Sequence, residues 1–178
     1  SASDAALAAL AEGLAEDITS GLARFPYLAI IDGAQLGVGE DSGTTAAGNG
    51  VRYILRGGLR SAGSELRLSV QLVEVETGAH VWSETYDRRL EGASIFELQD
   101  DLTLAIAGAV GPALSKSEIQ HAIRRPVQSL DAWDCVHRGL WHLYRHTPED
   151  ITKARAWAER GLELQADLVM AHCIIAFS

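Results

Sequence analysis

The chain opens with apolar side chains at helical spacing. Hydrophobic residues recur every third or fourth position from Leu7 to Phe25, which places them along one face of a helix. Pro26 cannot continue that helix, because its nitrogen carries no hydrogen to donate. We therefore predict a first helix over residues 4–25.

A short apolar run and a glycine-rich stretch come next. Tyr27–Ile31 is bounded by Pro26 and by the Asp32-Gly33 pair, a pattern typical of a buried strand. The stretch of residues 32–50 then contains six glycines. This density opposes regular structure and predicts a long connection.

From Val51 the apolar positions alternate with polar ones. This period of two predicts strands over residues 51–59, 66–72 and 80–86. Short polar turns join the strands, so we expect an antiparallel meander. The Gly57-Gly58 pair favours a bulge in its first strand.

Helical spacing returns after the meander. Ser94 and Glu97 have the spacing of a capping box, and an apolar stripe runs from Leu98 to Val110. Gly111-Pro112 predicts a kink, after which a second helical segment can continue to Arg125.

The remaining sequence is typical of helices at 130–144, 151–164 and 168–178, with Pro126 ahead of them. We predict an α+β protein in which helices pack on a small mixed sheet that contains an antiparallel three-stranded meander, followed by an all-α hairpin. The expected domains are residues 1–125 and 126–178. Because the sequence stops inside a further helical unit, we expect it to be part of a longer protein.

Composition narrows the classes of function. Of the 178 residues, 47% are hydrophobic, yet no apolar run reaches the length of a membrane span. Two cysteines fit a reducing compartment, and the N-terminal residues lack the pattern of a secretory signal, so we expect a cytoplasmic location. The net charge is −9, with 16 acidic and 8 basic residues up to Lys116. This balance disfavours nucleic-acid binding.

Two motifs raise the question of a bound cofactor or metal. Gly37, Gly39 and Gly43 follow a predicted strand but lead into another strand rather than a helix, so a flexible connector is favoured over a phosphate-binding loop. His142 and His146 are four residues apart, but no third ligand accompanies them at the spacing of a structural metal site. We predict neither a cofactor nor a metal.

No catalytic group is predicted either. Adjacent acids such as Glu16-Asp17 and Asp100-Asp101 point about 100° apart on a helix and cannot converge on one bond. The chain also has no nucleophile elbow. We expect that it is not an enzyme.

Aromatic side chains are the candidates for an interaction surface. Trp82 and Tyr86 share one face of the third predicted strand, and Trp133 and Trp141 lie on a predicted helix. Aromatic residues beside polar groups are common in protein interfaces. For Trp82 and Tyr86 we favour ordinary packing, because one face of the meander must cover the helices.

Three segments carry a resemblance to a known family. Residues 12–25 (EGLAEDITSGLARF), 51–90 and 96–103 (FELQDDLT), and above all Thr77–Trp82 (TGAHVW), resemble the TolB-like α/β domain. In bacteria that domain is often followed by tetratricopeptide repeats. Leu130–Trp133, after the basic Pro126 junction, is similar to such a repeat start.

The resemblance implies a regulatory region. It points to the C-terminal part of a multidomain class III adenylate cyclase, and less closely to a transcriptional regulator with a winged helix. The apolar strand that usually precedes the first helix is missing, and Ala166 replaces the repeat's usual proline. The sheet therefore has an open edge or is completed by another chain. No cyclase catalytic motif is present.

We therefore predict a module that regulates or scaffolds a cyclase by binding a partner protein or by forming a homodimer, with the open sheet edge as the first place for self-association. The alternative is a small-ligand sensor that closes the glycine-rich loop over a metabolite. The sensor region of a transcriptional regulator is a further alternative.

Overall fold

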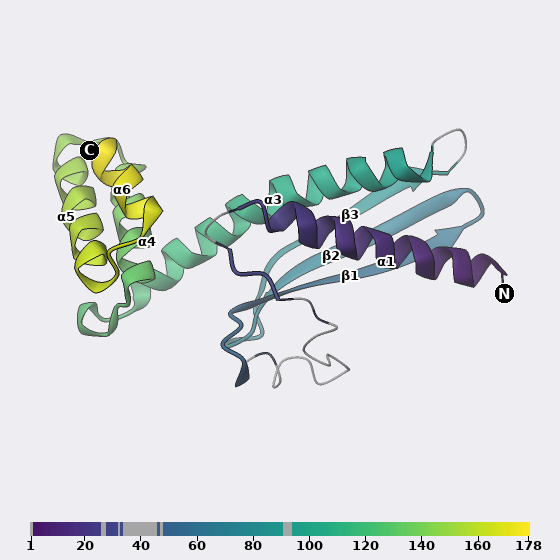
Figure 1. The fold of residues 1–178 in the computed structure, drawn as a ribbon, viewed down its shortest axis with the longest axis horizontal. Coiled ribbons are helices and arrows are strands. Elements are labelled where there is room, and N and C mark those ends of the chain that lie inside the picture. Colours follow the sequence, from purple (N-terminus) through teal and green to yellow (C-terminus); the bar gives the residue numbers. More distant parts are fainter. Residues whose placement is uncertain (1, 26–27, 32, 34–45, 47, 91–93) are drawn as a thin grey trace. The chain divides into compact units, whose positions relative to one another are not determined.

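A three-stranded antiparallel sheet lies at the centre of the first part of the chain (Figure 1). In this computed structural model, which describes residues 2–25, 28–31, 33, 46, 48–90 and 94–178, the strands are β1 (Tyr53–Ala62), β2 (Glu65–Glu74) and β3 (His80–Arg89). Alternate side chains of β2 are buried, as expected for a sheet with one covered face. These buried side chains are Leu66, Leu68, Val70 and Leu72.

The strand register matches the alternation in sequence. Leu68 of β2 is paired with Leu59 of β1 and with Tyr86 of β3. The predicted bulge at Gly57-Gly58 is absent, because these residues pair in unbroken register with Ser69 and Val70. The register shift instead lies between Leu72 and Val73.

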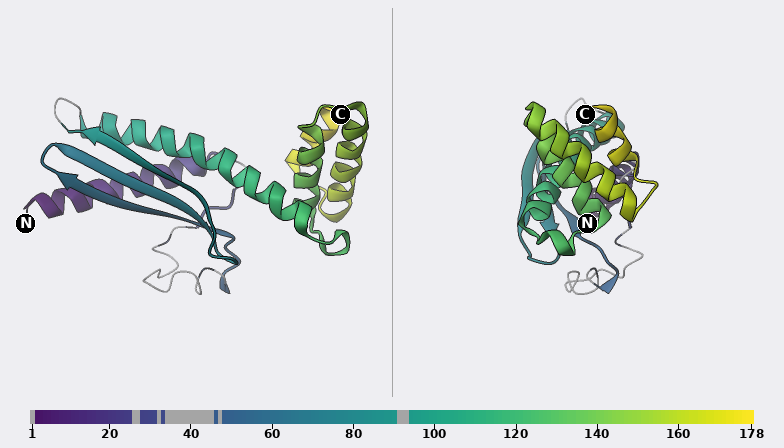
Figure 2. Two further views of the ribbon diagram at one scale, coloured as in Figure 1. Left: turned by 180° about the vertical axis from the view of Figure 1, so that it is seen from behind. Right: turned by 90° about the vertical axis from the view of Figure 1, so that its left-hand side faces the viewer.

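Two helices cover the inner face of the sheet: α1 (Ala2–Leu22) and the first part of α3 (Ile95–Arg124) (Figures 1 and 2). They approach each other closely at two glycines. A Cβ on Gly13 would clash with the Gln99 side-chain nitrogen, and one on Gly21 would lie 3.3 Å from Cγ2 of Thr103. The apolar stripes predicted for both helices are buried. Their buried residues are Leu10, Leu14, Ile18 and Leu22 of α1 and Leu98, Leu102, Ile106 and Val110 of α3.

The predicted α+β class is confirmed, but one predicted strand is not found among the described residues. Of the predicted strand Tyr27–Ile31, Tyr27 lies outside the described residues and residues 28–31 form no strand. No strand of the described residues pairs with them, and an isolated strand leaves its backbone groups without partners. Most of the glycine-rich stretch, including Gly37, Gly39 and Gly43, lies outside the described residues. Ala46 and Gly48, within that stretch, are helical.

Helix α3 continues through Pro112 to Arg124, so the expected division into two segments is wrong. Pro112 removes the hydrogen bond that would go to the carbonyl oxygen of Gly108. Both residues are exposed, and a carbonyl on the solvent side can bind water instead. The proline is therefore tolerated at this position.

The last part of the chain is helical. A short 3-10 turn, η1 (Val127–Ser129), leads to α4 (Ala132–Leu143), α5 (Pro148–Leu164) and α6 (Val169–Ala176). Helices α4 and α5 are antiparallel and meet at two glycines. A Cβ on Gly139 would lie 3.2 Å from the Ala154 carbonyl oxygen, and one on Gly161 would lie 3.3 Å from that of Ala132.

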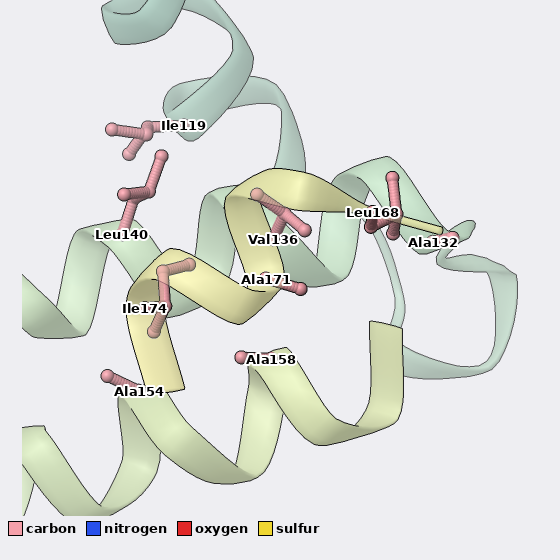
Figure 3. Packing of buried hydrophobic residues seen from close by; sticks show 9 residues of the cluster. All are labelled: Ile119, Ala132, Val136, Leu140, Ala154, Ala158, Leu168, Ala171 and Ile174. Carbon is pink, nitrogen blue, oxygen red and sulfur yellow. The ribbon is translucent and has the colours of Figure 1, made fainter. Parts of the chain in front are cut away.

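A cluster of apolar side chains fills the space between these helices (Figure 3). Val136 of α4 and Ala158 of α5 are completely buried, and Ile174 of α6 is nearly so. The remaining members are Ile119, Ala132, Leu140, Ala154, Leu168 and Ala171.

By its internal contacts the chain divides into two compact units, Ser1–Ala113 and Leu114–Ser178. The boundary falls within α3. Among the described residues, no helix combines the length and apolar character that crossing a membrane requires.

Candidate interaction surfaces

Trp82 and Tyr86, the first pair of candidate residues, lie on the inner face of β3. Tyr86 is buried and Trp82 is half-buried, opposite Leu68 and Leu72 respectively. The Tyr86 hydroxyl donates to Oε2 of Glu84 over 3.0 Å. Burial, followed by this hydrogen bond, raises the pKa of Tyr86 to about 12. Both aromatic side chains thus contribute to packing within the first unit.

Arg88 connects the same face of β3 to α3. Its Nε donates to Oδ2 of Asp101 over 2.8 Å, and its guanidinium carbon lies 5.9 Å from the centre of the Tyr86 ring. The sequence analysis did not connect Arg88 with Asp101. The contact between them could not be read from spacing, because it depends on how the helix lies on the sheet.

Trp133 and Trp141, the second pair, lie two turns apart on α4 and pack against the apolar cluster of the second unit. Both are half-buried. The Trp133 ring meets His137 edge-on, with 4.6 Å between ring centres, and Nδ1 of His137 donates to the Trp133 carbonyl oxygen over 2.9 Å. The Arg145 guanidinium lies 4.9 Å from the Trp141 ring centre, within cation-π range.

Only one of the two histidines considered as metal ligands, His142, lies beside a carboxylate. Nδ1 of His142 lies 2.8 Å from Oδ1 of Asp150, whereas His146 is exposed, with a φ of 51° at the turn after α4. Asp150 also accepts from the Thr147 hydroxyl over 2.7 Å. These two hydrogen bonds, that of Thr147 first, lower the pKa of Asp150.

This arrangement is a helix cap. Thr147 is the N-cap of α5, and its hydroxyl accepts from the Asp150 amide, while His142 ties the end of α4 to the same carboxylate. Within the described part of the chain, no group of three or more His, Cys, Asp or Glu residues is placed to hold a metal ion.

Neither cysteine joins a candidate site. Cys135 is buried on α4 and Cys173 is exposed on α6. Burial raises the pKa of the Cys135 thiol, which lowers its reactivity as a nucleophile.

Sequence reasoning missed a charged network at the start of the second unit. Asp134 is completely buried, and its Oδ2 lies 2.5 Å from an Arg125 guanidinium nitrogen. Asp131 and Asp134 form a reciprocal capping box at the start of α4. Their three-residue spacing is the same signal that identified Ser94 and Glu97, so this cap was readable from the sequence.

Arg138 and Trp157 extend this network to α5. The Arg138 guanidinium carbon lies 5.0 Å from the centre of the Trp157 ring, and that of Arg160 lies 5.8 Å from it. Trp157 was not singled out in the sequence, because it lies outside the pattern of apolar positions that predicted the hairpin.

Comparison with known proteins gives one partial match of note. No family model matches the chain. A protein of Rhizobium meliloti (strain 1021) named "Putative adenylate cyclase 3" is 30% identical over 170 residues. The match covers 93% of this chain but 29% of that protein, so the chain spans less than a third of its relative's length.

Proposed function

We propose that this chain is a non-catalytic regulatory or protein-interaction module of a bacterial signalling protein, and that the parent protein is an adenylate cyclase. The observation that carries the proposal is the extent of the match. A relative named as an adenylate cyclase aligns with 93% of this chain, while the aligned part makes up 29% of the relative. A segment of that size leaves most of the parent protein for other domains.

The local chemistry supports a role without catalysis. The clustered ionisable groups have structural partners: Asp150 caps α5, Asp134 pairs with Arg125, and Arg88 pairs with Asp101. These contacts account for the position of each group by capping or ion pairing, without a catalytic role.

The assignment of residues 1–125 to a TolB-like domain and of 126–178 to a tetratricopeptide-like repeat belongs to the same proposal. The close glycine contacts of α4 with α5 support the second part, since stacked helix pairs of this kind need small residues where they meet. In this proposal the half-buried Trp133 and Trp141 serve the partner surface, whereas Trp82 and Tyr86 pack within the first unit. The protein is cytoplasmic.

Measuring cyclic AMP formation would test the proposal. The isolated chain should not convert ATP to cyclic AMP, whereas the full-length gene product should do so. Trp141→Leu, which keeps apolar bulk, should change the activity or its response to partner protein. Arg124→Met, an exposed substitution in the same unit, is the control and should leave the activity and its response unchanged. Thermal unfolding of both variants reports on their folding.

Two results would contradict the proposal. One is turnover of ATP by the isolated chain. The other is a full-length gene product without a cyclase domain, which would remove the link to adenylate cyclases.

A further inference from the structure

Helix α3 carries a ridge of exposed residues at four-residue spacing. Within the first unit the ridge consists of Phe96, Asp100, Leu104, Gly108 and Pro112. Leu104 is 77% exposed and Phe96 is 76% exposed, more than any other large hydrophobic residue described in that unit. A leucine in the middle of a long helix gains free energy when a partner covers it.

Gly108 leaves a gap on the ridge one turn after Leu104. Apart from the backbone of its own helix, a Cβ built on Gly108 would meet no atom of the described residues within 4 Å. Within that part of the chain, neither a side chain nor a neighbouring element occupies the space above Gly108. Side chains at four-residue spacing form the ridges that enter grooves between such ridges on another helix. A large apolar residue beside a gap therefore matches a second copy of the same surface.

We propose that a second copy of this chain binds on the α3 ridge, antiparallel to the first and related to it by a two-fold axis near Ile106. Leu104 of each copy then packs over Gly108 of the other, as an isologous interface requires. Covering this ridge leaves the buried side of α3, with Leu102 and Ile106, on the sheet.

Charge selects the antiparallel orientation. Parallel helices would set Asp100 directly beside its own copy. Around an axis near Ile106, the two copies of Asp100 are about 18 Å apart along the helix at 1.5 Å per residue. That separation exceeds the Debye length of about 8 Å at physiological ionic strength, so the repulsion is screened.

The ridge avoids a charge conflict that self-pairing of the edge strand β1 would bring in one central register. Pairing two copies of β1 about Gly58, near the middle of the strand, would set Arg56 of one copy opposite Arg60 of the other. Like charges directly opposite each other destabilise a strand pair. The α3 ridge carries no such conflict.

Sedimentation velocity of the purified chain over a range of concentrations tests the dimer. We expect a concentration-dependent species of twice the 19.1 kDa chain mass. Leu104→Asp and Gly108→Gln should each raise the dimer Kd at least about tenfold, since each removes the packed contact twice per dimer. Gly108→Gln keeps the test independent of folding, because the space above Gly108 is open within one chain.

Val169→Asp is the matched control, since Val169 is an exposed apolar residue of α6, and it should leave the Kd unchanged. A chain that stays monomeric up to about 1 mM would overturn the proposal. So would a dimer that neither ridge variant weakens, which would indicate pairing elsewhere, such as at the sheet edge.

Disulfide trapping tests the orientation. In a Cys173→Ser background, which removes the exposed native thiol, chains with Leu104→Cys are mixed with chains carrying Gly108→Cys. The antiparallel dimer predicts mainly the mixed disulfide, whereas parallel helices would give mainly Leu104→Cys chains linked to one another. These measurements need no nucleotide, so the absence of a dimer would not contradict the cyclase role. Likewise, loss of the cyclase role would not contradict the dimer.

Discussion

Arg138, on α4, donates a hydrogen bond from Nε to the carbonyl oxygen of Ala122 in the last turn of α3, over 2.9 Å. A second guanidinium nitrogen donates to the carbonyl oxygen of Arg125 over 2.6 Å. The last carbonyl groups of a helix have no partner within the helix, and they favour a nearby positive charge. One side chain therefore fixes the end of α3 against the helical hairpin.

Replacing Arg138 with methionine should destabilise the second unit. The substitution keeps the apolar stem but removes the charged donors, at a cost of about 2 kcal/mol in the free energy of unfolding. In a Trp82→Phe background the remaining tryptophans lie on α4 and α5, so urea unfolding followed by fluorescence reports on this unit. Exposed Arg124→Met should change the free energy of unfolding by less than about 0.5 kcal/mol. Equal losses in both variants would disprove the capping role.

The ion pair between Arg125 and Asp134 should show strong coupling. Arg125→Met leaves a completely buried carboxylate without its cation, which should cost about 3 kcal/mol. Adding Asp134→Asn removes the buried charge, so the double variant should be more stable than Arg125→Met alone. The same fluorescence assay measures both. Additive losses from the two substitutions would contradict a coupled pair.

Glycine substitutions should separate close helix contacts from open positions. Gly139→Ala forces a Cβ to within 3.2 Å of the Ala154 carbonyl oxygen and of Ile174 Cδ1, and overpacking of this kind costs about 1–3 kcal/mol. Gly108→Ala meets nothing within 4 Å and should stabilise α3 by up to about 1 kcal/mol through helix propensity. Thermal unfolding followed by circular dichroism measures the loss of stability in Gly139→Ala and the gain in Gly108→Ala. Stabilisation by Gly139→Ala would show that α4 and α5 lie further apart than the contact between Gly139 and Ala154 implies.

Periodicity predicted the parts of the fold that depend on one face being buried. Leu14 and Ile18 of α1, and Leu66 and Leu68 of β2, lie in the core because a period of 3.6 or 2 already states which side faces inward. Residues 28–31 were apolar enough for a strand, but a strand also needs a hydrogen-bonding partner. The presence of that partner is not a property of the local sequence.

The candidate site was less predictable, because its contacts join distant elements. Asp131 and Asp134 follow a local capping rule and could have been found. Arg138 binds carbonyl groups 13 to 16 residues earlier, and no spacing rule relates these positions. His142 was considered with His146 as a possible metal ligand, yet in the structure it binds Asp150 at a helix cap. The residue types indicated a possible cluster of polar side chains, and only the fold shows that it caps a helix.

The cap at Asp150 should make the stability of the second unit depend on pH in the acidic range. Hydrogen bonds from Thr147 and then His142 lower the pKa of Asp150, so the folded carboxylate binds a proton less readily than the unfolded one. Its contribution is therefore present above the unfolded pKa, about 4 for aspartate, and is lost as pH falls through the lower folded pKa.

Unfolding in urea at a series of pH values between about 2 and 6 tests this, because the range spans the unfolded pKa of aspartate. The difference in free energy of unfolding between the wild type and Asp150→Asn should be largest near the top of the range and shrink towards its lower end. Glu149→Gln is the matched control, since Glu149 has its pKa lowered by exposed Lys153. Its pH-dependent difference should weaken in high salt, which screens exposed pairs, whereas that of Asp150, fixed by hydrogen bonds from Thr147 and His142, should persist. A difference for Asp150→Asn that does not vary with pH would mean that the carboxylate is not preferentially ionised in the folded protein.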